Sequence, residues 1–337
     1  MADIALDVIK EEALLQLRIR DLPVQIAGTP LEKAITTLYA ELEEQKIPFR
    51  PECYLADEWF SPDGEPVIGI PFYLAHPRLI ALEEHMMLEA EGATPDWCMR
   101  LLRHETAHAL AHAYRLQKTP AWRRTFGDPG RPYAPETARP RLFSRSFVTN
   151  LEKGYAQAHP DEDWAETFAV WLNPESHWSS AYRNWPALEK LQFVDRLMAQ
   201  LQKRRLPARK GQKICQASRM RTRLAKYYVQ KRAFYREEFP EFFDSDLRKI
   251  FSTEAADGEA ARKFLEKHRR RLTVTIANWT RARRYTVDGL LKKLMTRCHA
   301  LKLHVGKTES ETVLDVSAYL TTLALNYFHT GKLKHTR

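Results

Sequence analysis

The sequence of 337 residues lacks any uninterrupted apolar run of the ~18 residues that a membrane span needs. We therefore expect no membrane-spanning helix. The N-terminal stretch mixes charged with apolar residues and does not have the apolar core and small-residue cleavage site of a signal peptide. The cysteines are few, far apart and without a Cys-x-x-Cys pair: Cys53, Cys98, Cys215 and Cys298. This spacing disfavours a disulfide framework or a zinc ribbon, and it predicts reduced thiols in a cytoplasmic protein.

Internal repeats and low-complexity tracts are also absent, which excludes repeat arrays and disordered chains. The apolar fraction of 44% and the charged fraction of 28% are typical of a soluble globular protein. A chain of this length can bury a full core and is expected to divide into two domains.

Charge is distributed unevenly along the chain. Residues 1–202 contain 21 Lys and Arg against 30 Asp and Glu, a balance of −9, whereas residues 203–337 contain 32 against 13, a balance of +19. The change falls at the segment Lys203–Pro207. It predicts an acidic domain over residues 1–202 and a basic domain over residues 203–337.

Periodicity and end signals predict the main elements. Thr29, Pro30 and Glu32 form a capping signal for a helix that reaches about Gln45. Two extended runs, Pro48–Phe60 and Val67–Leu74, predict a hairpin or two neighbouring strands, and Pro71 suggests that the second run lies at an edge. Further helices are expected from Pro95, from about Pro160, and over most of the chain beyond Lys203, where the last is Glu311–Phe328. The segment Lys118–Pro140, rich in proline, glycine and arginine, predicts a long loop.

The helix that begins at Pro95 contains the sequence His104-Glu105-Thr106-Ala107-His108. Two histidines four residues apart lie on one helical face and can bind one cation, and the intervening glutamate can reach a water bound to it. The alternative is a helix whose histidines are hydrogen-bonded core residues. A third ligand elsewhere in the chain would favour a metal site over hydrogen-bonded core histidines.

The candidates for that ligand lie on a second helix. His112 is excluded because eight helical residues span ~12 Å, and Ala111 and Tyr114 replace the glycine and the third histidine of a metzincin. In the segment Tyr155–Glu166, Glu162 and Glu166 share a face, and carboxylates buried beside aromatic residues must be paired or metal-bound. Alternatively, this segment is only an acidic first turn favoured by the helix dipole.

These motifs resemble those of known zinc enzymes. The His-Glu-x-x-His motif followed by Tyr155 and, seven positions later, Glu162 is similar to gluzincins of the lethal factor and Mlc titration factor group. Five stretches more closely resemble a bacterial family of zinc-binding metallopeptidases, whose name rests on the zinc motif and indicates no substrate. They are Leu55–Gly64, Pro71–Leu79, Trp97–Leu110, Tyr155–Leu172 and Asn184–Leu191.

The resemblance implies a role for each matching residue. His104, His108 and Glu162 would bind one Zn²⁺ per chain and leave a fourth position for water. Glu105 would be the general base and Tyr155 would donate a hydrogen bond to the oxyanion. Glu166 would fix the tautomer of a zinc histidine, although Glu166 as ligand and Glu162 as its support remains an alternative. The Val67–Leu74 run would pair with an extended peptide or would be an ordinary structural strand.

The basic half combines cationic with aromatic residues, as in the segment from Arg219 to Arg236. Such a surface suits nucleic acid or an acidic partner, but no nucleic-acid motif is present. The same pattern is also expected if the cationic residues lie on solvated helix faces and the aromatic residues lie in the core.

We therefore predict an α+β fold, with a zincin-like metallopeptidase domain followed by a basic all-helical domain. The predicted function is zinc-dependent hydrolysis of a peptide or amide bond in a peptide or protein substrate. Two alternatives remain: a non-catalytic zinc-containing protein that binds nucleic acid or an acidic partner through its basic domain, and a hydrolase of a non-protein amide. The substrate-binding residues and the oligomeric state are not predicted.

Overall fold

Threonine followed by proline begins helices α2 (Pro30–Glu44), α4 (Pro95–Tyr114) and α5 (Pro120–Phe126). The structure is a computed structural model and describes residues 6–87, 89–132, 144–151, 154–204, 211–234, 243–253 and 258–330. In α4 and α5 the threonine hydroxyl accepts a backbone N–H from the first helical turn. Thr29 instead donates its hydroxyl to Ile26 O, and Glu32 accepts the N–H of Gly28. The predicted helix is therefore confirmed, but Thr29 does not cap it.

The chain divides into two compact units. In the described residues, the first unit runs to Tyr227 and the second consists mainly of residues from Tyr228 onward. The first unit therefore extends beyond the change in charge near Lys203. The division into domains at residue 202 stays a prediction from charge.

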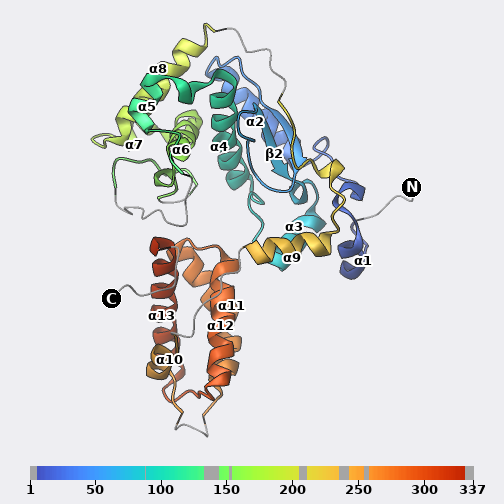
Figure 1. The fold of residues 1–337 in the computed structure, drawn as a ribbon, viewed down its shortest axis with the longest axis vertical. Helices are drawn as coiled ribbons and strands as arrows, with labels where there is room; N and C mark the ends of the chain where they lie inside the picture. The colour runs from blue at the N-terminus through green and yellow to red at the C-terminus, as the bar shows by residue number, and fades with distance from the viewer. Residues whose placement is uncertain are drawn as a thin grey trace. The chain divides into compact units, whose positions relative to one another are not determined.

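The first unit contains a small parallel sheet next to its helices (Figure 1). Strand β1 (Glu52–Ala56) pairs in parallel with β2 (Val67–Pro71). The hairpin alternative is therefore wrong, because hairpin strands are antiparallel. The second extended run is also shorter than predicted, since Phe72–Ala75 forms a 3-10 helix.

Strand β2 is buried along its whole length. On the side away from β1, Gly69 donates its N–H to Phe60 O and accepts the N–H of Phe60. A side chain at Gly69 would lie 2.9 Å from Ala56 Cβ and 3.0 Å from Phe60. The expected free edge is therefore occupied at Gly69, and glycine is needed there because backbone and ring approach so closely.

Helices α4 and α6 (Pro160–Leu172) pack together in the first unit, and α2 contacts α4 (Figure 1). The remaining helices of this unit are α1 (Glu11–Gln16), α3 (Pro77–Met87), α7 (Trp178–Ala181) and α8 (Ala187–Leu201). Helix α5 lies within the segment predicted as one long loop, so that prediction is wrong for Pro120–Phe126. Residues 133–143 of the same segment lie outside the described residues.

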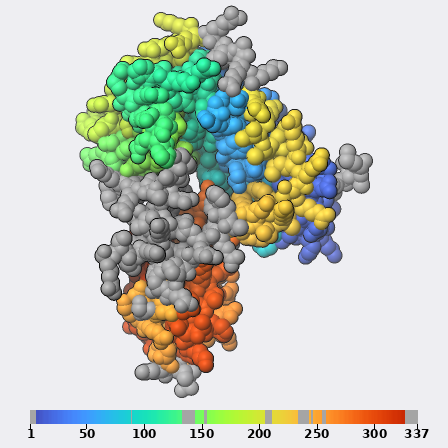
Figure 2. Space-filling view, viewed as in Figure 1, coloured from blue at the N-terminus to red at the C-terminus, as the bar shows by residue number. Residues whose placement is uncertain are grey.

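Residues 211–227 belong to the first unit although they are basic. Tyr54 donates its hydroxyl to Ile214 O, and Gln212 N donates to the carboxylate of Glu65. Figure 2 shows this yellow segment lying beside the blue strand region. These contacts bring a basic segment to one side of the small sheet.

The second unit is helical in its described part. Its helices are α10 (Asp244–Ile250), α11 (Ala261–Thr280), α12 (Arg284–Ala300) and α13 (Glu309–Thr330), with α9 (Leu224–Phe234) spanning the boundary. Thr308 and Glu311 form the predicted capping box, because each side chain bonds to the other's backbone N–H. One apolar cluster joins α10, α11, α12 and α13. No helix in the described part of either unit has both the length and the apolar character that a membrane crossing requires.

Candidate metal centre

Helix α4 places His104, Glu105 and His108 in the interior of the first unit. His104 is 2% exposed and Glu105 is 7% exposed, while His108 is half-buried. The ring centroids of the two histidines lie 4.9 Å apart. The spacing of four residues brings them to one face of the helix, as the sequence predicts.

Helix α6 is anchored against α4 by aromatic side chains. Trp164 is fully buried and donates its indole N–H to Ala107 O, between the two histidines, at 2.9 Å. Phe168 and Trp171 continue the buried side of α6. This contact fixes the part of α6 that contains Glu162 next to the histidines.

Three side-chain atoms converge between the two helices. His104 Nε2 lies 3.1 Å from His108 Nε2 and 3.1 Å from Glu162 Oε2. The remaining distance, from His108 Nε2 to Glu162 Oε2, is 3.6 Å. His104, His108 and Glu162 are the metal-compatible cluster found among the described residues.

Glu166 lies on the other side of the His104 ring. Its Oε1 atom is 3.0 Å from His104 Nδ1. Because a carboxylate only accepts, Nδ1 must donate, and in the neutral imidazole Nε2 then carries a lone pair directed at the cluster. The structure therefore places Glu162 and Glu166 at opposite nitrogens of one histidine.

Glu166 is itself held by a segment that the sequence analysis did not predict to be part of the site. Its carboxylate accepts the N–H groups of Asn150 and Leu151, both at 2.9 Å, and the side-chain amide of Asn150 at 3.2 Å. Asn150 also contacts α4, since it donates to Arg100 O. These residues precede Glu166 by 15 and 16 positions, and no local pattern indicates that the chain returns there.

The chemistry of the cluster fits a divalent cation. Glu162 Oε2 is buried, and the Nε2 atoms of both histidines lie nearby. Each of these three atoms can donate an electron pair to one cation. Zinc with ligands at ~2.1 Å in a tetrahedron separates its ligand atoms by roughly 3.4 Å. The three separations between the ligand atoms, 3.1, 3.1 and 3.6 Å, bracket that value.

The electrostatics of the cluster favour positive charge. Burial lowers the pKa of His104, but the carboxylates of Glu162 and Glu166 outweigh this effect and raise it well above its usual value. For Glu162, burial raises the pKa, and the hydrogen bonds and charges of the two histidines outweigh it and lower the pKa. The carboxylate of Glu162 therefore stays ionised and attracts a cation.

Glu105 and Tyr155 complete the set of predicted residues. Burial raises the pKa of Glu105, and the neighbouring His104 and His108 oppose this in part. Tyr155 begins a short 3-10 helix before α6, and its ring centroid lies 5.6 Å from that of His104. The structure thus brings every predicted site residue to one region where α4 and α6 meet.

A family model matches this part of the chain. The family is described as "Putative zinc-binding metallo-peptidase", and the match covers residues 99–184. The candidate metal ligands and the residues around them lie in that range, whereas both strands and the helices α10 to α13 lie outside it. No curated protein and no solved structure matches the chain.

Proposed function

We propose that the protein is a zinc-dependent hydrolase of peptide or amide bonds. The observation that carries the proposal is the triangle of His104 Nε2, His108 Nε2 and Glu162 Oε2, whose sides have the lengths expected of three zinc ligands. The family match over residues 99–184 supports the same function. One zinc ion per chain would be held by these three side chains.

Glu162 is proposed as the third ligand and Glu166 as its support. Glu162 shares the side of His104 that faces His108, whereas Glu166 bonds to the opposite ring nitrogen. A hydrogen bond from Nδ1 to a carboxylate fixes the ring and strengthens Nε2 as a ligand. Two backbone N–H groups hold Glu166 in this position.

The residues around the cluster have the chemistry that hydrolysis requires. A bound zinc ion supplies a Lewis acid that polarises the carbonyl group and makes water more acidic. Glu105 removes a proton from the attacking water and passes it to the leaving amine. Tyr155 donates a hydrogen bond to the oxyanion that forms on the carbonyl. The placement of the tyrosine seven residues before Glu162 supports a site of the gluzincin type.

Two variants test this proposal. Metal analysis of the purified protein should find about one zinc per chain, and Glu162→Ala should lose it, since two histidines alone bind zinc weakly. Glu105→Gln should keep the zinc but lose turnover of a peptide library by a factor of 100 or more, which is roughly what a general base contributes.

Three other outcomes would contradict parts of this proposal. If wild-type protein cleaves no peptide while the chain binds DNA or RNA in a salt-dependent way, it is a binding protein instead of a peptidase. If cleavage occurs only with non-peptide amides, zinc hydrolysis stands and the substrate class changes. Retention of full activity by Glu105→Gln would remove Glu105 from the mechanism.

A further inference from the structure

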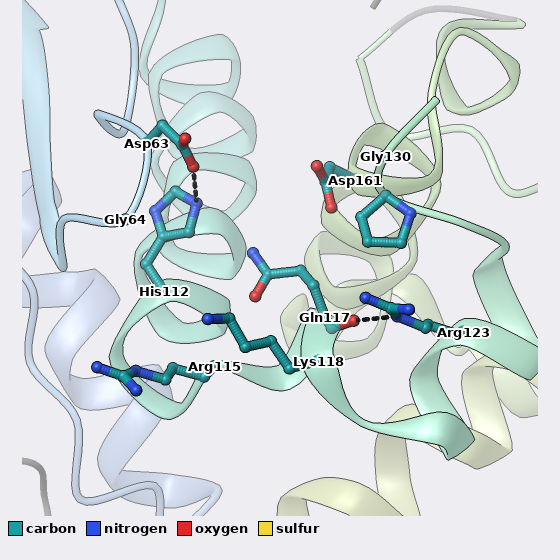
Figure 3. Close-up of a pocket in the computed structure, with 10 residues that line it drawn as sticks. Asp63, Gly64, His112, Arg115, Gln117, Lys118, Arg123, Gly130 and Asp161 are labelled. Atoms are coloured by element: carbon teal, nitrogen blue, oxygen red, sulfur yellow. Dashed lines mark hydrogen bonds and ion pairs between the residues drawn. The ribbon is translucent and has the colours of Figure 1, made fainter. Parts of the chain in front are cut away.

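A cavity of about 400 Å³ opens beside the metal cluster in the first unit (Figure 3). Two of the residues that line it are neighbours of the metal-compatible residues in the chain, since His112 lies one helical turn beyond His108 and Asp161 directly precedes Glu162. The remaining side of the cavity is formed by the end of α4, the turn after it and α5. Its volume lies in the range of known ligand pockets and suits one or two amino-acid residues.

Basic residues line one part of this cavity. Arg115, Lys118 and Arg123 line it, and all three are exposed. Arg115 caps α4 with a left-handed backbone, φ 52°, which turns the chain sharply. In the described residues, neither Arg115 nor Lys118 has a carboxylate partner. Two cations without partners around one cavity attract an anionic group.

Arg123 is oriented toward the same space. Its Nε donates to Gln117 O at 3.0 Å, which holds the guanidinium beside the turn after α4 and leaves its terminal N–H groups available. A guanidinium binds a carboxylate through two parallel hydrogen bonds. Lys118 directly follows Gln117 in this turn, and both Lys118 and Arg123 line the cavity.

Two carboxylates also line the cavity, at the end opposite Arg115 and Lys118 (Figure 3). Asp63 lies 3.7 Å from His112 and its side chain is fully exposed. Asp161 lies on the first turn of α6, beside the cluster. The cavity is therefore polarised, with Asp63 and Asp161 at one end and Arg115 and Lys118 at the other (Figure 3).

We infer that this cavity binds a carboxylate-bearing residue next to the bond to be cleaved, and that Lys118 and Arg123 hold its carboxylate. The inference rests on the proposed function and specifies its substrate class. The carboxylate belongs either to an acidic side chain or to the free C-terminus of the substrate. Both sources present the same group to the same cations.

The first test uses a peptide that the wild-type protein cleaves at one bond. Versions with Glu, Gln or Lys at each position beside that bond are compared by kcat/KM. Wild-type protein should prefer Glu to Gln by about tenfold at one position, the value of one charge-assisted hydrogen bond. The double variant Lys118→Gln/Arg123→Gln should lose this preference, mainly through KM, and Arg123→Lys should keep part of it.

The matched control is Arg124→Gln. Arg124 is the next residue of α5, is also exposed, and lines a different cavity. It should keep both the zinc and the preference for Glu. An equal loss in Arg124→Gln would overturn the assignment, because the preference would then reflect net charge. A preference for Lys would also overturn it, since Asp63 and Asp161 would then define the cavity.

Binding separates this inference from the failure of the proposed function. Zinc-loaded Glu105→Gln protein is titrated with the capped peptide acetyl-Ala-Ala-Glu-Ala-amide and with its Gln counterpart. A second pair, acetyl-Ala-Ala-Ala with a free or an amidated C-terminus, identifies the source of the carboxylate. Tighter binding of either anionic probe, lost in Lys118→Gln/Arg123→Gln, supports the cavity even without turnover. Equal binding of charged and neutral probes overturns the inference.

Discussion

Glu166 is completely buried and makes four hydrogen bonds, yet none of its atoms belongs to the metal-compatible cluster. Such a carboxylate acts through the histidine that it orients. The hydrogen bond from Nδ1 to Glu166 helps to fix the orientation of the His104 ring. The position of Nε2 therefore depends on a residue that lies outside the metal-compatible cluster.

We predict that Glu166→Ala weakens zinc binding by roughly 10- to 100-fold, as is typical when the hydrogen-bond partner of a ligand is lost. The dissociation constant is measured by competition with a chelator of known affinity. Asp195→Ala serves as a control, because Asp195 also accepts a side-chain hydrogen bond from an α6 residue, Trp171, but lies away from the cluster. Unchanged zinc affinity in Glu166→Ala would contradict the role given to this residue.

The sequence predicted part of the candidate site and not the rest. His104 and His108 are set by spacing within one helix, so their meeting follows from helical geometry. Helical spacing alone does not separate Glu162 from Glu166, since both lie on one face of α6, and the tyrosine seven positions before Glu162 favoured Glu162 as the ligand. Which nitrogen of His104 each carboxylate meets depends on the packing of α6 on α4. Asn150 could not be found at all, because its contact is made by the tertiary path of the chain.

At the scale of elements, a buried ion pair joins α2 to α4. Arg103, which precedes His104, donates from Nε and from a terminal nitrogen to the two carboxylate oxygens of Glu41, at 2.8 and 2.6 Å. Both side chains are 9% exposed. This two-point contact fixes the rotation of α4 at the turn that contains the first histidine.

We predict that Arg103→Met lowers the free energy of unfolding by about 3–5 kcal/mol, because it leaves the charge of Glu41 buried without a partner. Replacing both residues, in Arg103→Met/Glu41→Leu, should recover most of the loss. Urea denaturation at neutral pH measures both. The control is Arg50→Gln, which breaks an exposed ion pair of Arg50 with Glu43 of α2. This change should cost about 1 kcal/mol or less.

In the second unit, Asp288 of α12 joins α11 through a similar contact. Arg269 donates to both of its oxygens and Lys292 to one of them. Burial raises the pKa of Asp288, but the hydrogen bonds and charges of Arg269 and Lys292 outweigh it and lower the pKa below its ordinary value. A group with a lowered pKa stabilises the folded state above its unfolded pKa, which is about 4.

We predict that Asp288→Asn destabilises the second unit by about 1–3 kcal/mol at pH 7. The difference from wild type should shrink as the pH falls below about 4 and through the lowered pKa of Asp288, because the wild-type carboxylate is then protonated too. Denaturation followed by circular dichroism at pH 7 and pH 3 measures it. Asp315→Asn, which removes an exposed partner of Lys307, should show little effect at either pH.

The prediction of elements succeeded where the signal is local. The start of α4 follows from Thr94 and Pro95, and the start of α13 from the Thr308 capping box. Helix α5 was missed although Thr119 and Pro120 give the same signal, because the glycine, proline and arginine content around it predicts a loop. The parallel pairing of β1 with β2 was not predictable, since strand direction depends on how the chain between them folds.

At the scale of the whole molecule, the two units have separate cores. The residues of the candidate site all lie in the first unit, and the apolar cluster of the second unit is built from α10 to α13. A ligand that binds the folded form of one unit stabilises that unit alone. Zinc should therefore affect only part of the unfolding of the chain.

We predict two thermal transitions in calorimetry, of which only one depends on zinc. A chelator should lower the temperature of that transition by roughly 10 °C. Zinc at 1,000 times its dissociation constant adds about 4 kcal/mol to the free energy of unfolding. Each kcal/mol shifts the melting temperature of a unit of this size by about 2–4 °C. The other transition should stay unchanged. Glu162→Ala should remove the zinc dependence, and Asp288→Asn should shift only the zinc-independent transition. A single transition that moves as a whole would contradict the independence of the units.

The indole contact between Trp164 and Ala107 lowers the conformational entropy that is lost when Glu162 joins a cation at the histidines. Glu162 follows His108 by 54 positions. In an unfolded chain, recruiting Glu162 to a cation already held by the histidines would mean closing a loop of that length, at a loss of conformational entropy worth about 4 kcal/mol near 25 °C. In the folded protein, the packing of α6 on α4 has already removed that freedom. The difference corresponds to an effective concentration of the third ligand roughly a thousandfold higher than in the flexible chain.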